Sequence, residues 1–218
     1  MAARDLRILH PAIERYVDAL VPRRDAVMRE MEARARREGI PIVGPVVGRL
    51  FCLLALAGGA KRVMELGSAI GYSTLWWARA VGPHGKVWYT DASPANARDA
   101  EAYLRRGGVL GRVKLLVGDA LESMARVKGR FDIVFCDIDK PGYPAAYRAA
   151  MRRLRPGGLL VVDNTLWKGR VTRGRASARR DPATAGVQAL NRLAFASDRG
   201  AFATLIPLRD GVTVVVKR

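Results

Sequence analysis

The stretch FCDIDKPGY, residues 135–143, places two carboxylates and an ammonium group directly after an apolar run. The run from Phe131 to Phe135 is typical of a buried strand. Asp137 and Asp139 then follow two positions apart, and Lys140 comes next. Charged groups at the end of a core strand are useful where that strand end borders a ligand site. The segment is therefore the first candidate for chemistry.

A second set of polar side chains follows another apolar run. In GGLLVVDN, Asp163 and Asn164 end a predicted strand that we expect to neighbour the first one. Together with Asp137 they would offer three hard oxygen ligands, a set that suits Mg²⁺ or a similar ion. Each of the three could instead be a helix cap or a turn former. All three at adjacent strand ends favour a metal site.

Lys140 lies three residues after Asp137. Partly buried beside a divalent cation, it could take a proton from a hydroxyl group that the metal has made more acidic. An ordinary surface lysine at the start of a helix is the alternative, and the sequence leaves both open.

A glycine turn with the sequence ELGSAIGYS joins the first predicted strand to a helix. Gly67 and Gly71 would let a ligand approach the backbone closely, and the helix N-terminus offers free N–H groups. The spacing is G-x-x-x-G, which differs from the G-x-G-x-x-G of dinucleotide-binding folds. A tight packing turn would explain the same glycines.

Asp91 ends the second predicted strand, about 20 residues beyond the glycine turn. An acid at this place can accept hydrogen bonds from two ribose hydroxyls. With Glu65 it suggests a nucleoside ligand and no pyrophosphate, although a charge at a helix N-terminus would also explain Asp91. The segment VGDA, residues 117–120, could line an adenine ring, or Asp119 could simply cap a helix.

A doubly wound α/β sheet is the fold that would bring these residues together. Apolar residues at helical spacing predict three helices before the sheet, in residues 5–21, 23–39 and 41–59. Strands and helices then alternate. Strands are expected at residues 61–67, 85–91, 112–119, 131–139 and 157–164, and helices at 72–81, 93–108, 120–127, 143–154 and 183–196.

The end of the chain differs from this alternation. Residues 201–208 and 212–218 are two apolar runs joined by a short turn with the sequence RDG, which predicts an antiparallel hairpin. We therefore expect one Rossmann-like domain over residues 1–218, with helices in 1–58 and an α/β core in 61–218. The sheet is expected to be mostly parallel, with the hairpin at its end.

Composition limits the class of protein. The chain has 218 residues and a formal net charge of +18, with 38 Lys and Arg against 20 Asp and Glu. This charge could attract a polyanion such as RNA, but an arginine-, alanine- and glycine-rich chain also indicates compositional bias. Six bases occur between Lys168 and Arg180 before the first acid, Asp181. An ordinary solvated loop explains them at least as well as a nucleic-acid patch.

The sequence favours a cytoplasmic protein without a membrane partner. The longest apolar stretch, residues 50–57, is far shorter than the roughly 20 residues of a membrane span. Residues 1–10 lack the apolar core of a signal peptide. Cys52 and Cys136 stand in apolar surroundings without metal-ligand spacing, so we expect both to be reduced.

Together, these motifs resemble the cation-dependent O-methyltransferases that use S-adenosylmethionine (SAM), the family of catechol and caffeoyl-CoA O-methyltransferases, in the form of a bacterial member. The resemblance covers the chain from near Ile40 to its end. It rests on VMELGSAIGYSTLW, GKVWYTD, FDIVFCDIDKPGY, GGLLVVDNTLWKGRV and IPLRDGVTV.

The resemblance implies roles for individual residues. Lys140 matches the catalytic lysine of the catechol enzymes, and Mg²⁺ or another divalent cation would bind to Asp137, Asp163 and Asn164. The family also implies a sheet with a reversed last strand, and a homodimer with N-terminal helices near the substrate entrance. The residues implied to contact SAM are Val43, Glu65, Gly67, Ser68, Ser73, Asp91, Ala120 and Asp139.

The implied mechanism is a direct methyl transfer. The metal chelates two vicinal oxygens of the acceptor, Lys140 helps to deprotonate one of them, and the oxyanion attacks the sulfonium methyl in line. Lys168 stands where plant caffeoyl-CoA enzymes have an asparagine, and the N-terminal segment differs from theirs. The resemblance therefore does not carry coenzyme A recognition over to this chain. A counterpart of the glutamate that holds the second hydroxyl in catechol enzymes is not evident.

Three functions are compatible with these residues. The leading hypothesis is a SAM- and metal-dependent O-methyltransferase acting on a vicinal-diol, catechol-like small molecule. The second is an O-methyltransferase of the wobble 5-hydroxyuridine in tRNA, with the arginine-rich loop on phosphates. The third is a non-enzymatic, basic nucleic-acid-binding protein on the same fold. The metal ligand set with Lys140 argues against this third hypothesis.

Overall fold

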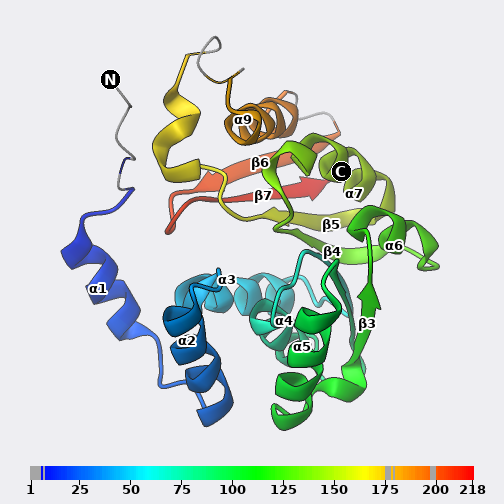
Figure 1. Ribbon diagram of the computed structural model, residues 1–218. Coiled ribbons are helices and arrows are strands. Elements are labelled where there is room, and N and C mark those ends of the chain that lie inside the picture. The colour runs from blue at the N-terminus through cyan, green and yellow to red at the C-terminus, as the bar shows by residue number, and fades with distance from the viewer. Residues whose placement is uncertain (1–5, 7, 175–177, 179, 197–199) are drawn as a thin grey trace.

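Seven strands form one sheet in the order β3-β2-β1-β4-β5-β7-β6 in the computed structural model, which describes residues 6, 8–174, 178, 180–196 and 200–218 (Figure 1). Strands β1 to β5 are parallel, and β7 is antiparallel to both β5 and β6. The predicted doubly wound sheet with a reversed hairpin is confirmed. The strands are β1 Arg62–Leu66, β2 Lys86–Asp91, β3 Val113–Val117, β4 Phe131–Cys136, β5 Leu154–Val162, β6 Ala201–Ile206 and β7 Val212–Lys217.

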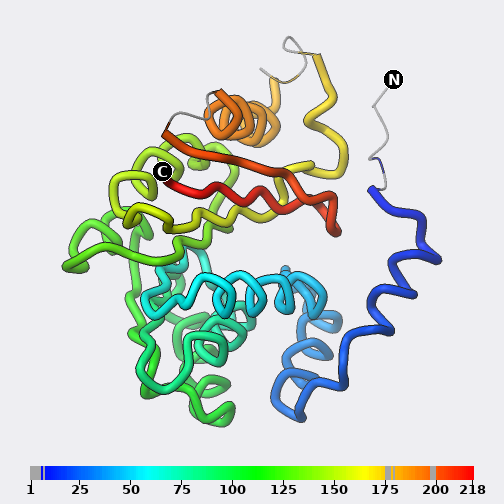
Figure 2. Tube along the Cα trace, turned by 180° about the vertical axis from the view of Figure 1, so that it is seen from behind, coloured from blue at the N-terminus to red at the C-terminus, as the bar shows by residue number. Residues whose placement is uncertain are grey.

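Helices cover both faces of this sheet, as buried strands require (Figures 1 and 2). One core cluster joins α2, α3, α4 and α5 to the sheet, and a second joins α6, α7 and α9 to the opposite face. The helices are α1 Pro11–Leu20, α2 Ala26–Glu38, α3 Gly44–Ala57, α4 Tyr72–Ala80, α5 Pro94–Arg106, α6 Ala120–Arg126, α7 Tyr143–Arg153 and α9 Pro182–Ala194. Short 3₁₀ turns are η1 Leu110–Arg112, η2 Lys140–Gly142 and η3 Trp167–Thr172.

Helix boundaries follow the capping residues in the sequence. Ser93 accepts a hydrogen bond from the Asn96 N–H at 3.3 Å, and Asp119 accepts one from the Glu122 N–H at 2.8 Å. Both are N-caps, as expected, and Gly39 ends α2 in the left-handed conformation. These local signals fix where α5 and α6 begin, immediately after the ends of β2 and β3.

The first predicted helix is shorter than expected. Residues 5–21 were predicted as one helix, but α1 begins at Pro11, after an N-cap at His10. Proline disfavours a helical conformation in the residue before it, so the preceding apolar residues cannot join the helix. None of the α1 residues is buried, and Tyr16 and Leu20 remain 67% and 64% exposed. In Figure 1, α1 stands apart from the sheet.

An aromatic cluster holds the central strand β4 against α3 and α4. The Phe51 ring stacks on Trp77 with 4.4 Å between centroids, and it lies 4.6 Å from the ring of Phe135. All three side chains are fully buried. The strand that leads to the polar segment DIDK is therefore held rigidly by the core.

The structure also bears on the cysteines and on membrane insertion. Cys52 and Cys136 are both free thiols, as expected, and burial raises the pKa of Cys136 to about 12. In the part of the chain that the structure describes, the helices are too short or too polar to cross a bilayer.

Helix α9 lies directly on the backbone of the segment that carries Lys140. A methyl group added at Gly186 of α9 would come within 2.1 Å of the Lys140 carbonyl oxygen and 2.9 Å of the Pro141 Cα. Only glycine permits this approach, so the position of Lys140 depends on the absence of a side chain in a distant helix.

We expect Gly186→Ala to lower the free energy of unfolding by about 1–3 kcal/mol, because overpacking against backbone outweighs alanine's higher helix propensity. Urea denaturation would measure the change. Gly111→Ala is the matched control, since the added methyl group there has no neighbour within 4 Å. Equal stability of the two variants would contradict the packing argument.

Candidate active site

The carboxyl ends of β1, β4 and β5 bring the predicted polar residues together. In the register of the sheet, Leu66 lies opposite Cys136, and Cys136 lies opposite Val162. Main-chain hydrogen bonds continue this register, from Asp137 N to Leu66 O at 2.8 Å and from Asp163 N to Cys136 O at 3.2 Å. Asp137 and Asp163 therefore lie side by side, as predicted from the sequence.

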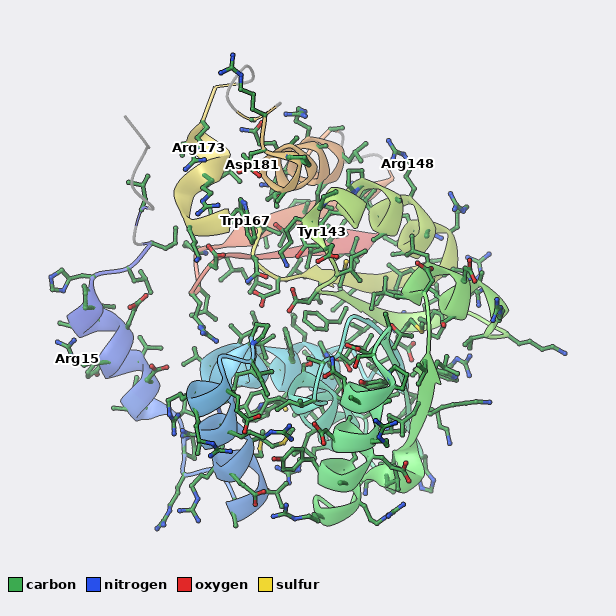
Figure 3. The ribbon with its side chains drawn as sticks, in the orientation of Figure 1. Arg15, Tyr143, Arg148, Trp167, Arg173 and Asp181 are labelled. Atoms are coloured by element: carbon green, nitrogen blue, oxygen red, sulfur yellow. The ribbon has the colours of Figure 1, made fainter. Side chains whose placement is uncertain are left out.

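Lys140 forms an ion pair with Asp137. Its Nζ donates to Asp137 Oδ1 at 2.8 Å and to the Ile138 carbonyl at 3.3 Å. The ammonium group also lies 5.0 Å from the centroid of Tyr143 and 5.6 Å from that of Trp167, two residues labelled in Figure 3. Only 11% of the lysine side chain is exposed. Lys140 is thus held in the site and is not an ordinary surface lysine.

The pKa values of both aspartates are raised in this arrangement. Burial, with a further contribution from the neighbouring Asp137 carboxylate, raises the pKa of Asp163 to about 7. Burial also raises the pKa of Asp137, although the Lys140 ammonium opposes that shift. Two acids held this close together create a site where added positive charge is favourable.

Asn164 follows Asp163 in a left-handed backbone conformation, with φ of 55°. Asparagine tolerates this conformation better than most residues. Groups of three or more His, Cys, Asp or Glu side chains suited to a metal do not occur in the described part of the chain. Two aspartates and one asparagine amide are still a donor set of the kind that hard divalent cations accept, with water completing the shell.

Glu65 lies on β1, which β4 separates from β5, and is completely buried. Its Oε2 accepts a short hydrogen bond from Thr74 Oγ1, while its Oε1 has no partner among the described residues. Burial raises the pKa of Glu65 to about 7, although the hydroxyl groups of Ser73, Thr74 and Ser68 act in the opposite direction. An orphaned buried carboxylate oxygen marks a place where a polar ligand group is missing.

The glycine turn adopts the conformation that its residues predict. Gly67 and Gly71 have φ of 81° and 84°. A Cβ at Gly67 would lie 2.6 Å from the Asp137 carbonyl, and one at Gly71 would lie 2.9 Å from the Ala100 Cβ. Internal packing therefore suffices to explain both glycines, and a role in ligand approach stays a prediction.

Asp91 lies beside this turn, at the end of β2. Its Oδ2 accepts from the Ala69 N–H at 2.9 Å, and its Oδ1 accepts from the Ser93 N–H at 2.8 Å and from Asn96 Nδ2 at 3.0 Å. The acid thus joins the glycine turn to the start of α5. Both interpretations from the sequence remain compatible with this position, since carboxylate lone pairs are still available for a ligand.

The other residues predicted to contact a cofactor surround the same strand ends. Ser68 and Ser73 are buried, and Ser68 Oγ accepts from the Thr90 N–H at 3.3 Å. Ala120 begins α6 directly after β3. Asp139 is exposed at the start of η2, and Val43 is buried immediately before α3.

A cavity of about 800 Å³ opens next to Asp163, and Asp137 and Lys140 are not among the residues that line it. Asp163 and Asn164 line it from the sheet, and Val43 lines it from the start of α3. The opposite walls come from α1, at the left in Figure 1, and α2, which lies below the left end of the sheet in that view. The side chains that line these walls include Glu14, Val17, Asp18, Arg24, Glu32 and Arg36.

Sequence reasoning missed the residues that hold the cavity walls in place. The Arg209 guanidinium, in the turn between β6 and β7, donates to the carbonyl oxygens of Ile42 at 3.0 Å and of Val43. Asp210 accepts from the Lys168 N–H. The sequence RDG had indicated only a hairpin turn. The one available signal was a charged pair in a turn close to the predicted ligand edge.

On the side of the cavity formed by α1 and α2, Arg24 and Glu32 form a bidentate ion pair, with N–O distances of 2.9 and 3.0 Å. Tyr72 also donates to Glu32 at 2.7 Å. Burial alone would raise the pKa of Glu32, but the hydrogen bonds from Arg24 and Tyr72 hold it below its usual range. This network ties α2 to the start of α4.

The arginine-rich loop gives no support for contact with RNA. Residues 175–177 and 179 lie outside the described residues. Arg173 and Asp181, both labelled in Figure 3, form a long ion pair of 3.8 Å. The hypothesis of a tRNA substrate therefore stays a prediction.

Acids and a glycine turn beyond the strand ends of a doubly wound sheet are the arrangement in which α/β enzymes bind nucleotide-like ligands. A sequence model described as O-methyltransferase matches residues 25–218. The chain belongs to the O-methyltransferase family. The hypothesis of a non-enzymatic binding protein is therefore wrong.

Relatives with assigned functions agree with this family. The chain is 36% identical to a catechol O-methyltransferase of Mycobacterium tuberculosis over 159 residues, which are 72% of each protein. It is 30% identical to a catechol O-methyltransferase of Niastella koreensis over 188 residues, which are 84% of each.

Solved structures share the fold over nearly the whole chain. An O-methyltransferase from Bacillus cereus, solved in complex with SAH, superposes with a TM-score of 0.83 at 28% identity, covering 95% of this chain and 97% of that one. The O-methyltransferase TomG from Streptomyces achromogenes, in complex with SAM, gives a TM-score of 0.85 at 28% identity, covering 94% and 96%.

The raised pKa of Glu65 makes stability depend on pH. A glutamate titrates near 4.5 when unperturbed and at about 7 in this fold. The stability that its neutral form contributes is complete below pH 4.5 and is lost as the pH rises through about 7. We expect Glu65→Gln to gain roughly 3 kcal/mol relative to the wild type between pH 4.5 and pH 8.

Thermal unfolding of both proteins across this pH range would measure the difference. Glu101→Gln, on the partly exposed surface of α5, is the control substitution. A stability difference for Glu65→Gln that stays constant with pH would show that the carboxyl group is not perturbed.

Proposed function

We propose that this chain transfers the methyl group of SAM to a hydroxyl oxygen of a small vicinal-diol acceptor, with the help of Mg²⁺ or another divalent cation. The observation that carries the proposal is the position of Asp137 and Asp163 on adjacent strand ends. Lys140 lies 2.8 Å from the first, and the second lines the cavity. Metal ligands, a base and a substrate space would then meet in one place.

SAM is the proposed methyl donor because relatives of the same fold were solved with SAM or SAH. It would supply an electrophilic methyl group on a sulfonium centre. On this chain, Asp91 would accept hydrogen bonds from the ribose, and the glycine turn with Ser68 and Ser73 would border the methionine part. The unpartnered Oε1 of Glu65 supports a polar ligand group at this turn.

Asp137, Asp163 and Asn164 would hold the metal. Both carboxyl groups are destabilised as anions in this fold, so a divalent cation would relieve the repulsion between them. When bound, the cation would orient two acceptor oxygens and lower the pKa of one hydroxyl group.

Lys140 would act as the base. Its ammonium group now balances the charge of Asp137. A cation bound to that carboxylate would balance its charge in place of the Lys140 ammonium. As a neutral amine, Lys140 could then accept a proton from the acceptor hydroxyl. Tyr143 and Trp167 would keep bulk water away from the amine, because their rings flank it.

The cavity supports a small aromatic acceptor. Its volume of about 800 Å³ lies within the range of small-molecule sites, and Ile42, Val43 and Leu208 give it apolar walls beside Asp163. A diphenol ring could pack against these side chains while its hydroxyl oxygens face the aspartates.

We also propose that the chain forms a homodimer. Leu20 on α1 and Leu53 and Leu56 on α3 are each more than 60% exposed. Contact with a second copy would remove these side chains from water. A monomer in analytical ultracentrifugation at micromolar concentration would contradict this assembly.

We expect transfer of labelled methyl groups from SAM to 3,4-dihydroxybenzoic acid in the presence of Mg²⁺, and its loss in EDTA. Asp163→Ala should lower turnover by about 100-fold or more, because metal affinity depends on a full ligand set. Its affinity for SAM should stay within about threefold of the wild type, since the acid would not touch the cofactor.

Asp99→Ala, on the surface of α5, is the matched control and should retain activity. Turnover of Asp163→Ala at the wild-type rate, or full activity in EDTA, would exclude the metal mechanism. Equilibrium dialysis with SAM separates loss of cofactor binding from loss of chemistry.

A further inference from the structure

A row of basic side chains occupies the edge of the sheet opposite the active site. Parallel strands all begin at this edge, and β7, which is antiparallel, ends there near the C-terminus marked in Figure 1. We call the row the basic edge. In the order of the strands, its members are Arg112, Lys114, Lys86, Lys61, Arg62, Lys128, Arg130, Arg153, Arg155, Lys217 and Arg218.

Hydrogen bonds link neighbours along the basic edge. The Lys86 ammonium lies 3.4 Å from the Gly111 carbonyl at the start of β3. The Arg62 guanidinium donates to the carbonyls of Lys128 at 2.6 Å and of Arg130 at 2.9 Å, at the start of β4. The Lys86 N–H also donates to the Lys61 carbonyl at 2.7 Å, so the row is continuous from β3 to β4.

The same pattern continues from β4 to β7. Arg153 donates to the Ala125 carbonyl at 3.0 Å and to the Gly129 carbonyl at 2.8 Å. The Lys217 ammonium donates to the carbonyls of Met151 at 2.6 Å and of Leu154 at 3.0 Å. These partners are main-chain carbonyls, so they fix the side chains without neutralising their charge.

Few acidic groups among the described residues offset the charge of this row. Apart from Arg218, the members of the basic edge form one ion pair with a carboxylate of the described residues, between Arg155 and Asp132 at 2.5 Å. The C-termini of α4, α5, α6 and α7 also face this edge, and each contributes about half a negative charge. Together these groups offset only a minor part of the charge of the other ten cations.

An exposed aromatic ring lies at the end of the row. Phe202, at the start of β6, is 49% exposed, and the Arg218 guanidinium carbon lies 5.8 Å from its ring centroid. A ring beside a guanidinium group offers a surface on which a nucleic-acid base can stack.

We propose that the basic edge binds a single-stranded nucleic acid through its phosphates, with a base stacked on Phe202. Six strands spaced about 4.8 Å apart give the row a length of roughly 25 Å, enough for several nucleotides. A linear row of fixed cations ending in an aromatic ring matches a phosphodiester chain. The contacts are to phosphates and to one ring face, so binding is independent of sequence.

This surface is separate from the methyl-transfer site. Asp137 and Asp163 lie at the carboxyl ends of the strands, and the basic edge lies at their amino ends. A bound strand would leave the cavity open. The inference does not depend on the identity of the methyl acceptor.

Fluorescence anisotropy with a labelled, mixed-sequence DNA strand of about 20 nucleotides would test it, over a range of KCl concentrations. The edge variant is Lys128→Glu with Arg130→Glu, because both side chains are exposed at the centre of the row. The control variant is Arg15→Glu with Arg29→Glu, which makes the same change in net charge on α1 and α2. Arg15 is labelled in Figure 3, far from this edge.

We expect the edge variant to bind about tenfold more weakly or worse, with a log–log salt slope that is smaller by about 1.4, because two phosphate contacts are lost. The control variant should stay within about twofold of the wild type. Phe202→Ala should weaken binding of the single strand at least about fivefold and leave duplex binding unchanged, since a paired base cannot stack on the ring.

Equal weakening in the edge and control variants would overturn the proposal, because net charge alone would then explain the affinity. No binding by the wild type at low salt would also overturn it. Binding to vesicles of anionic phospholipid, with the same dependence on the edge and without nucleic-acid binding, would assign the surface to a membrane instead.

Methyl transfer and thermal unfolding should be unchanged in each variant, which shows that the fold is intact. If Lys128→Glu with Arg130→Glu does not fold, Lys86→Glu with Lys114→Glu tests the other half of the row. Unchanged DNA binding by that folded variant would contradict a continuous surface.

Discussion

Two main-chain hydrogen bonds determine where the acids of the active site lie. They join Asp137 to β1 and Asp163 to β4, and they extend the parallel register by one residue beyond the strands. Side chains alternate between the faces of a strand, so a slip of one residue would turn each acid to the wrong side. The apolar runs of β1, β4 and β5 prevent such a slip, because it would move a whole set of buried side chains. The packing of the core and the placement of Asp137 and Asp163 therefore depend on the same strand register.

The register also explains how the site tolerates groups that are costly to bury. Asp137 gains an ion pair with Lys140, and the Tyr143 hydroxyl donates to the Asp163 carbonyl at 2.8 Å. Glycine residues provide the room, since the Gly67 turn passes close to the Asp137 backbone and Gly186 lets α9 approach Lys140. The unfavourable electrostatics are concentrated on a few side chains, while the neighbouring backbone of Asp137 and Asp163 continues the hydrogen bonds of the sheet.

Most of the sheet could be predicted from the sequence because its signals are local. Apolar runs gave the strands, Ser93 and Asp119 gave the starts of helices, and the sequence RDG gave the hairpin. The meeting of Asp137 with Asp163 followed from one general rule, that parallel strands end at a common edge.

The cavity could not be predicted in this way. Arg209 contacts carbonyls more than 160 residues earlier in the chain, and nothing in the local pattern near Ile42 indicates such a partner. The bidentate pair of Arg24 and Glu32 was equally hidden, because both residues belong to a strongly charged segment. For α1, apolar spacing predicted a helix over residues 5–21, yet Pro11 set its start and none of its residues is buried. Periodicity indicates a helical face but does not say whether anything covers it.

The position of β7 has a consequence for how the chain folds during synthesis. β7 follows β6 in the sequence, yet it lies between β5 and β6 in the sheet. β6 therefore has no strand to pair with when it leaves the ribosome. Its apolar residues cannot join the sheet until β7 has emerged. The Arg209 contact to residues 42 and 43 forms at the same late stage. A nascent chain that stops before β7 thus lacks both an interior strand of the sheet and a closed cavity. The enzyme therefore becomes functional only after this segment has been synthesised.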